Sequence, residues 1–91
     1  MALTKETVVD KIEVLEMGQV QVRTATRVKE DGTVLSSSFH RHVLDPSIKI
    51  DNTWGDTDIS GEDARVQAVA NATWTDSVKT AYQEMVDAQS L

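Results

Sequence analysis

The chain has 91 residues, 40% of them hydrophobic and 26% charged, which is the composition of one globular domain rather than a disordered tail or a fibrous repeat. The absence of cysteine excludes disulfide stapling and Cys-ligated zinc, and no segment approaches the roughly 20 apolar residues of a membrane span. A net charge of −6 argues against general binding to nucleic acid or to an anionic membrane, because both need a surplus of Lys and Arg. We therefore expect a single soluble domain over residues 1–91, without nucleic-acid or membrane partners.

The clearest local pattern is a strict alternation of two sets of side chains over residues 19–29, which is the period of a β-strand. Asp31-Gly32 follows, and Asp-Gly between two β-rich runs favours a type I′ hairpin because both central residues of that turn need positive φ. The next strand is then expected over residues 33–44. With a two-residue loop, the expected facing pairs are Val28 with Leu35, Thr24 with Phe39, Val22 with Arg41 and Val20 with Val43.

A further strand over about residues 7–16 precedes this hairpin. If residues 17–19 form a three-residue loop with Gly18 at positive φ, the apolar side chains of all three strands share one face. The expected pairs are Val14 with Val22 and Ile12 with Thr24, and Val8 joins the same face. A two-residue turn would place these side chains on the polar side. The sequence therefore predicts a three-stranded antiparallel meander over about residues 7–44.

Asp45-Pro46 is expected to end the third strand, because proline cannot donate to a strand ladder. Residues 45–59 are interpreted as an acidic loop that adds a short strand or lies across a partner, and the run from Asp51 is acidic without the spacing of a calcium loop. Trp54 in this loop either anchors a protein interface or folds back over the chain's own core.

Residues 60–90 are predicted to form two short helices, or one kinked helix, that pack on the sheet. Ser60 is the expected cap of the first helix and Thr75 of the second, since each hydroxyl can accept from a free amide of the first turn. The fold class is therefore α+β, with one layer of sheet and one of helix.

No pattern in the sequence points to catalysis. The chain has no Gly-rich phosphate loop, no nucleophile elbow and no thiol. A catalytic site needs several convergent groups. We expect a protein that is not an enzyme, with no catalytic residue, no cofactor and no small-molecule substrate.

The one metal candidate is His40-Arg41-His42, because alternate strand residues share a face and two imidazoles about 7 Å apart can share a ligand. Two histidines are too few for a closed site, so transition-metal binding at His40 and His42 would need a trimer, as in the iron-binding His-x-His pattern of trimeric phage spike tips. The expected register sets Arg23 beside His40 and Gln21 beside His42, which favours a polar, solvated or interfacial face instead.

The charges are divided along the chain, with a net +2 over residues 19–43 and a net −5 over residues 44–63. The expected register places Arg23 and Arg27 on one sheet face and Arg41 on the other. A basic face without interleaved aromatic residues favours contact with acidic protein loops, such as those of a neighbouring copy, over contact with nucleic acid. The residues predicted to form a protein interface are Arg23, Arg27, Arg41, Trp54, Asp56 and Asp58.

Three strings carry a resemblance to a known group of proteins: residues 20–32 (VQVRTATRVKEDG), residues 38–43 (SFHRHV) and residues 58–63 (DISGED). They resemble small, mostly uncharacterised proteins that tailed bacteriophages encode among their virion genes. The resemblance covers most of the chain and brings no activity or catalytic residue with it. It implies a structural protein of the virion, made in the host cytoplasm and present in several copies in the tail, baseplate or fibre attachment region.

The function expected from the sequence is therefore to join neighbouring subunits of a phage particle, with other virion proteins and its own copies as partners. A sheet with two open edges supports this expectation, since open edges are a liability unless assembly covers them. A second hypothesis is a small acidic intracellular phage protein that binds and regulates a host protein, and a third is a capsid decoration protein.

Overall fold

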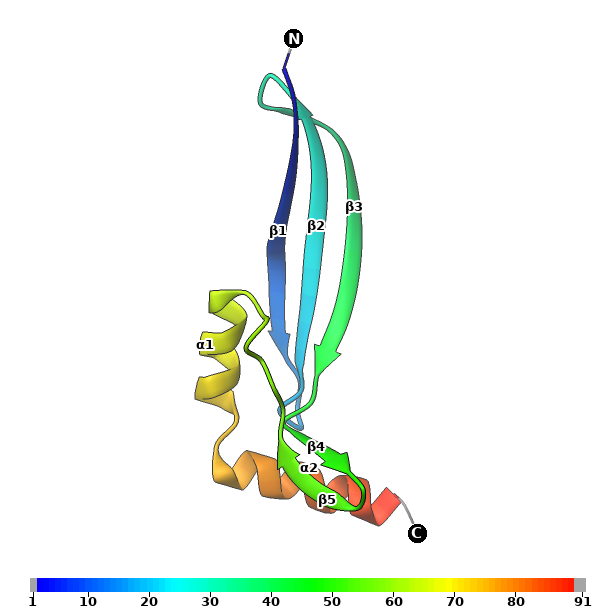
Figure 1. Ribbon diagram of the computed structural model, residues 1–91, viewed down its shortest axis with the longest axis vertical. Helices are drawn as coiled ribbons and strands as arrows, with labels where there is room; N and C mark the ends of the chain where they lie inside the picture. The colour runs from blue at the N-terminus through cyan, green and yellow to red at the C-terminus, as the bar shows by residue number, and fades with distance from the viewer. Residues whose placement is uncertain (1, 90–91) are drawn as a thin grey trace.

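The computed structural model describes residues 2–89 and contains two antiparallel sheets and two helices, which confirms the predicted α+β class (Figure 1). The long sheet has the order β1-β2-β3, and a short sheet pairs β4 with β5. The elements are β1 (Leu3–Val14), β2 (Val20–Glu30), β3 (Thr33–Leu44), β4 (Ser47–Ile50), β5 (Thr53–Asp56), α1 (Ala64–Thr73) and α2 (Asp76–Gln89).

The turns of the long sheet have the backbone conformations that the sequence predicts. Asp31 and Gly32 both have positive φ, at 51° and 85°, as a type I′ turn between β2 and β3 requires. Gly18 has φ 88° in the loop before β2, where the amide of Leu15 donates to the carbonyl of Gln19 at 2.8 Å. This loop spans residues 15–19 and is thus longer than the expected three residues.

The predicted register between β2 and β3 is wrong by one residue, because a bulge near the turn inserts Leu35 into β3. The observed pairs are Val28 with Ser36, Thr24 with His40, Val22 with His42 and Val20 with Leu44. A shift of one residue moves every side chain of β3 to the other face. His40 and His42 therefore share the face of Val22, and Arg41 shares the face of Arg23.

A second bulge, at Asp10, divides β1. On the loop side of Asp10, Ile12 pairs with Val22 and Val14 with Val20, so both lie on the predicted face but two residues away from the predicted register. On the far side the pairing parity changes, and Val9 rather than Val8 joins that face.

The stretch interpreted as an acidic loop contains a second β-hairpin instead. β4 and β5 are four residues each and meet at Asp51 and Asn52, whose φ values of 52° and 64° again fit a type I′ turn. Short strands with little alternation give a weak sequence signal, which is why only the possibility of a short strand was expected here.

The two C-terminal helices are separate, with Trp74 and Thr75 between them. The cap predicted for the first helix is wrong: α1 begins at Ala64, and the carboxylate of Asp63 accepts from the amide of Arg65 at 2.8 Å. The cap predicted for the second is confirmed, since the Thr75 hydroxyl accepts from the amide of Val78 at 3.3 Å.

The core lies where α1 packs on the base of β2. Val20, Val22 and Val66 are fully buried there, and Trp74 packs against them while its indole Nε1 donates to the Gly18 carbonyl at 2.7 Å. Helix α2 packs against β4 rather than the long sheet, with Tyr82 as its buried side chain. Each helix thus covers a different sheet.

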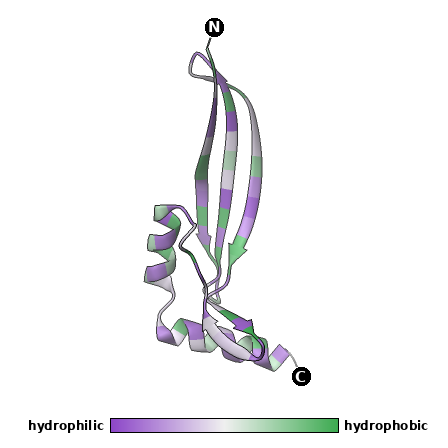
Figure 2. Ribbon diagram, in the orientation of Figure 1, coloured by the Kyte–Doolittle hydropathy of each residue, from purple (hydrophilic) through white to green (hydrophobic). Residues whose placement is uncertain are grey.

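The far end of the long sheet, which carries the Asp31-Gly32 turn, has no helix over it (Figure 1). Hydrophobic and hydrophilic residues alternate along its strands (Figure 2). The molecule measures 58 × 25 × 23 Å, and its radius of gyration is 17.0 Å, against about 12 Å for a compact chain of this length. Its accessible surface of 6126 Å² also exceeds the roughly 5,200 Å² expected for a folded monomer of this mass.

Candidate interaction surfaces

A ladder of ion pairs covers one face of the long sheet and joins β1 to β2. The guanidinium of Arg23 donates to both carboxylate oxygens of Asp10, at 2.9 and 2.8 Å. Glu6 pairs with Lys29 at 3.1 Å and with Arg27 at 3.4 Å. The basic face predicted from the sequence therefore exists, but most of its charge is neutralised within the chain.

These pairs change the acidity of the carboxylates. The hydrogen bonds from Arg23 lower the pKa of Asp10 below its ordinary 3.8, and those from Lys29 lower the pKa of Glu6 below 4.5. The sequence did not reveal these partners, because the bulge places Asp10 on this face. Glu6 and Asp10 have the same four-residue spacing as Arg23 and Arg27, and this is the signal that was available.

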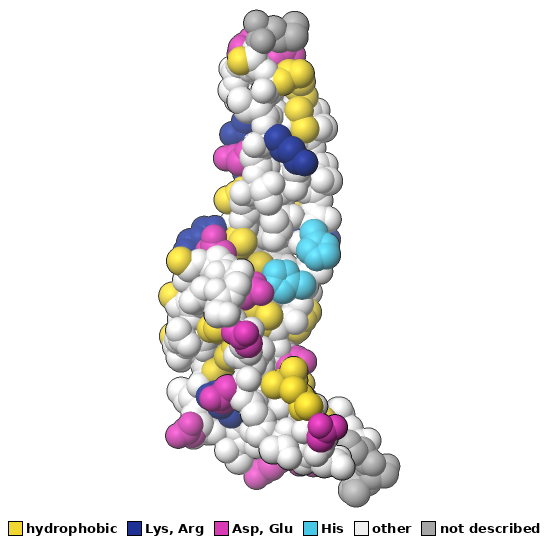
Figure 3. Space-filling view, in the orientation of Figure 1, with side chains coloured by type: hydrophobic (Ala, Val, Ile, Leu, Met, Phe, Trp, Pro, Cys, Tyr) yellow, Lys and Arg dark blue, Asp and Glu magenta, His cyan; other side chains and the backbone are white. Residues whose placement is uncertain are grey.

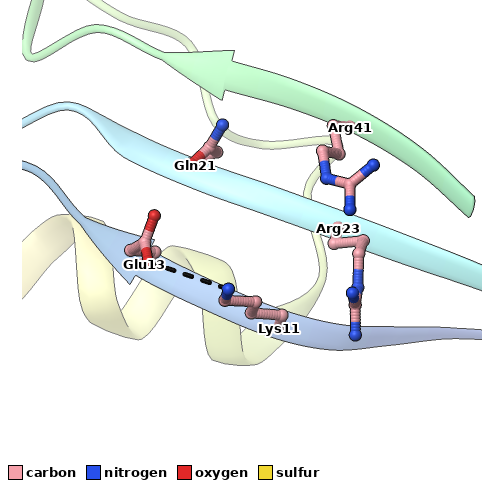
Figure 4. Close-up of a pocket in the computed structure, with 5 residues that line it drawn as sticks. All are labelled: Lys11, Glu13, Gln21, Arg23 and Arg41. Carbon is pink, nitrogen blue, oxygen red and sulfur yellow. Dashed lines mark ion pairs between the residues drawn. The ribbon is translucent and has the colours of Figure 1, made fainter.

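Arg41 is the exception on this face. It lies directly opposite Arg23 on the neighbouring strand, which corrects the prediction that the two occupy opposite faces. Figure 4 shows both around a small hollow that is also lined by Gln21 and by the pair Lys11 and Glu13, 3.8 Å apart. The hollow measures about 20 Å³, which is room for about one water molecule. Arg41 itself is exposed and forms no ion pair with the residues that the structure describes.

The two histidines lie on the opposite face, beside α1 (Figure 3). Their rings are stacked with centroids 6.2 Å apart, and His42 Nε2 is 2.8 Å from Glu62 Oε1. The predicted neighbours Arg23 and Gln21 are wrong, since Thr24 and Val22 lie opposite instead. Within residues 2–89, no three or more His, Cys, Asp and Glu side chains are grouped to hold a metal ion.

Trp54 folds back onto its own chain. Its ring meets Tyr82 edge to face at a centroid distance of 6.1 Å, and its Nε1 donates to Asp87 at 3.4 Å. Lys49 lies over the same ring and pairs with Asp87 at 2.9 Å, which lowers the pKa of that carboxyl. The indole is half-buried, so it packs within its own chain while part of it stays exposed, and its predicted role in an interface stays a prediction.

The two acidic residues predicted for the interface also have partners within the chain. Asp56 pairs with Lys79 of α2 at 2.9 Å, although it stays largely exposed. Asp58 accepts from the amide of Ser60 at 2.9 Å, and this bond lowers its pKa. The predicted interface residues are thus spread over the long sheet, the short hairpin and the segment before α1, rather than gathered into one site.

The sequence missed an apolar groove at the base of β3. It measures about 340 Å³ and lies between the end of β3, β4 and α2. Its apolar lining consists of Val43, Leu44, Ile48, Trp54, Tyr82 and Val86. Burial and the nearby Asp45 raise the pKa of Tyr82 above its ordinary 10.0. The elements that form the groove, β3, β4, β5 and α2, meet only in the folded chain.

The edge strand β3 carries a row of exposed apolar side chains. Val34, Leu35, Phe39 and Val43 are about half exposed, at 47%, 55%, 50% and 50%. The Arg23 guanidinium lies over the Phe39 ring at 4.6 Å, a cation–π contact that holds this side chain on the sheet face.

Comparisons with protein-family models, with curated proteins and with solved structures found no match to this chain. Among the described residues, no helix has the length and apolarity needed to cross a membrane.

Proposed function

We propose that this chain is a non-enzymatic structural subunit that joins neighbouring subunits in a multi-copy assembly. The observation that carries the proposal is the far end of the long sheet, which has two open edges and no covering layer. Single-layer sheets of this kind gain stability when another chain covers them. Assembly also offsets the small core of such a short chain.

The exposed apolar side chains support the same proposal. Large hydrophobic residues that are exposed in the chain include four of β3 and two of β4, and they run from the far end to the base of the molecule. Extended apolar surface is one of the features that mark protein interfaces. Two polar side chains that could serve in a chemical site, Arg23 and His42, each contact a carboxylate of the same chain.

The resemblance to small proteins of tailed bacteriophages gives the assembly its proposed identity. On that basis the chain belongs to the tail, baseplate or fibre attachment region of a phage particle, is made in the host cytoplasm, and has virion proteins and its own copies as partners. The proposal includes no cofactor. Metal analysis of the purified assembly tests this part, since a stoichiometric transition metal would instead assign His40 and His42 of neighbouring copies as ligands.

Two measurements test the proposal. Light scattering of the purified chain measures its mass in solution, and mass spectrometry of purified particles measures its presence and copy number. We expect a mass above the 10.0 kDa of one chain and a fixed stoichiometry in particles. A monomeric chain that is absent from particles, and that recovers one host protein in a pull-down, would instead establish the regulator of a host protein.

A further inference from the structure

We infer that two copies of this chain pair antiparallel along their β3 edges, forming one continuous six-stranded sheet in which Phe39 of each copy lies opposite Phe39 of the other. The turn end of each copy then rests in the apolar groove at the base of its neighbour. The inference rests on the proposed function and names the partner and the surface that it uses.

The two open edges of the sheet differ in how well they are protected against pairing. The β1 edge is interrupted by the bulge at Asp10, carries several charged side chains, and has its Val9 carbonyl occupied by the guanidinium of Arg65 from α1. Bulges, edge charges and covering groups are the usual means by which proteins block edge pairing. The β1 edge is therefore closed to a partner strand along much of its length.

The β3 edge lacks these protections. Beyond its bulge at Leu35 it runs without interruption to Leu44, and Arg41 is its only residue with a permanent charge. Apart from Arg41, its exposed side chains are hydrophobic residues, hydroxyl residues and His40, which suit a cross-strand contact. Since β1 is blocked, pairing of β3 with β1 of a neighbour is disfavoured, and β3 with β3 remains. Pairing of β3 with β3 uses the same surface on both copies, so assembly through this edge stops at two copies.

Symmetry restricts the register of this pairing. A two-fold axis perpendicular to the sheet keeps each face on its own side, and residues directly opposite in an antiparallel ladder share a face. One residue of β3 must therefore lie opposite itself. The axis has to lie near the middle of Thr33–Leu44 to use the full strand, and away from Arg41 to avoid placing two like charges opposite each other.

An axis at Phe39 meets both conditions and matches apolar residues with one another. It sets the two Phe39 rings together and brings Val43 near Leu35 and Val34 of the second copy, because the bulge at Leu35 leaves Val34 on the same face as Phe39 and Val43. The two exposed residues at the turn end thereby reach the groove that Val43 and Leu44 help to line. The contact recurs at both ends of the dimer, so one arrangement covers the exposed apolar residues of β3 and fills the groove.

The first test is a charge placed at the contact. Leu35→Lys alters a side chain that is 55% exposed in the single chain, so folding is preserved, but in the dimer it brings an ammonium group against the groove. Leu3→Lys is the matched control, because Leu3 is 63% exposed at the same end of the sheet but on the β1 edge. We expect Leu35→Lys to raise the dimer dissociation constant about tenfold or more and Leu3→Lys to leave it unchanged, measured by sedimentation.

The second test uses the absence of cysteine, which makes every disulfide formed by a single-cysteine variant an intermolecular one. In the inferred register Ser38 lies opposite His40 of the second copy. We expect a mixture of Ser38→Cys and His40→Cys chains to form a mixed disulfide, within the roughly 7 Å between Cα atoms that such a bond permits. Ser36→Cys alone and Thr7→Cys alone, on β3 and β1, are expected to stay uncrosslinked.

The outcomes separate this inference from the function on which it rests. A mass above one chain that Leu35→Lys does not change, without the mixed disulfide, overturns the β3 pairing and leaves the structural role standing. A chain that is monomeric at every concentration but present in particles does the same. A monomeric chain that is absent from particles overturns both.

Discussion

The stability of the fold at low pH depends in part on one side chain, the carboxylate of Asp10. Its carboxylate is 13% exposed and accepts two hydrogen bonds from Arg23, with Arg27 at 3.8 Å. Its pKa in the folded chain is therefore below the 3.8 of an ordinary aspartate. A carboxylate with a lowered folded pKa contributes stability that is fully present above its unfolded pKa and is lost as pH falls through its folded pKa.

Asp10→Asn removes this titration, and we expect the variant to be less stable than the parent chain near pH 7. The difference should shrink as the pH falls below about 4, because the parent protonates the same group there while asparagine does not titrate. Urea midpoints measured for both chains between about pH 7 and pH 2 check this. Glu6 has a lowered pKa for a separate reason, its contact with Lys29, so the variant retains some acid sensitivity. A gap between the two chains that stays constant over this range contradicts the assignment.

The sequence identified the basic partners of these pairs but not their acidic ones. Arg23, Arg27 and Lys29 alternate visibly along one strand, and this local pattern placed them correctly on one face. Their partnership with Asp10 and Glu6 depends on how β1 aligns with β2, and a bulge changes that alignment without a strong local signal. The same reason explains the misplacement of Arg41 and of both histidines, since the bulge at Leu35 reverses the faces of β3.

Among the secondary-structure elements, helix α1 gives the sharpest comparison between sequence and structure. The sequence that begins at Ser60 has the pattern of a capping box. In the structure, however, Ser60 lies in a separate turn, in which the amide of Glu62 donates to the carbonyl of Ile59 at 3.0 Å. Asp63 is the residue whose carboxylate caps the first turn. Both residues are acceptable N-caps by type, so only the chain path distinguishes them.

Alanine substitutions at these two positions test which residue caps α1. We expect Asp63→Ala to lower the free energy of unfolding by about 1 kcal/mol, the usual cost of losing a cap. Ser60→Ala should change it by less than about 0.5 kcal/mol, as for a surface position without a special contact. Equal losses for the two variants in urea denaturation would show that both residues contribute to the start of the helix.

The two hairpins differ in how well their turn residues predict them from the sequence. Asp31-Gly32 was recognised because it lies between two long alternating strands, whereas Asp51-Asn52 adopts the same turn between strands of only four residues. The second hairpin is held by contacts with α2, including Gln83 to Ser47 at 3.1 Å and Trp54 with Tyr82. Such contacts come from distant parts of the chain, and neither composition nor spacing predicts them.

At the scale of the whole molecule, the stabilising buried contacts lie at one end of the chain's long axis. The fully buried side chains of the core cluster lie at the base of the long sheet, while β3 is exposed along most of its length. In the monomeric Leu35→Lys variant, amides of β2 near Val20 and Val22 should exchange with solvent most slowly and those of β3 near Ser37 much faster.

In the parent chain at concentrations that favour the dimer, protection of the β3 amides should rise while that of the β1 amides stays the same. Hydrogen exchange followed by mass spectrometry measures both strands in one experiment. If protection rose at the β1 amides but not at the β3 amides, the partner would pair with the β1 edge, which contradicts the inferred dimer.

The elongated shape of the molecule was not expected from composition, because a radius of gyration depends on how the elements stack rather than on which residues they contain.

The core also joins parts of the chain that are made at different times. Val20 of β2 is covered by Val66 of α1, which follows it by 46 residues. At translation rates of about 5–20 residues per second, the helix leaves the ribosome roughly 2–9 s after the strand it covers. Over about the second half of that interval, after Leu44 has been made, the meander is complete in sequence but uncovered on both faces. Neighbouring nascent chains on one messenger would then present their β3 edges to each other before either has closed its core.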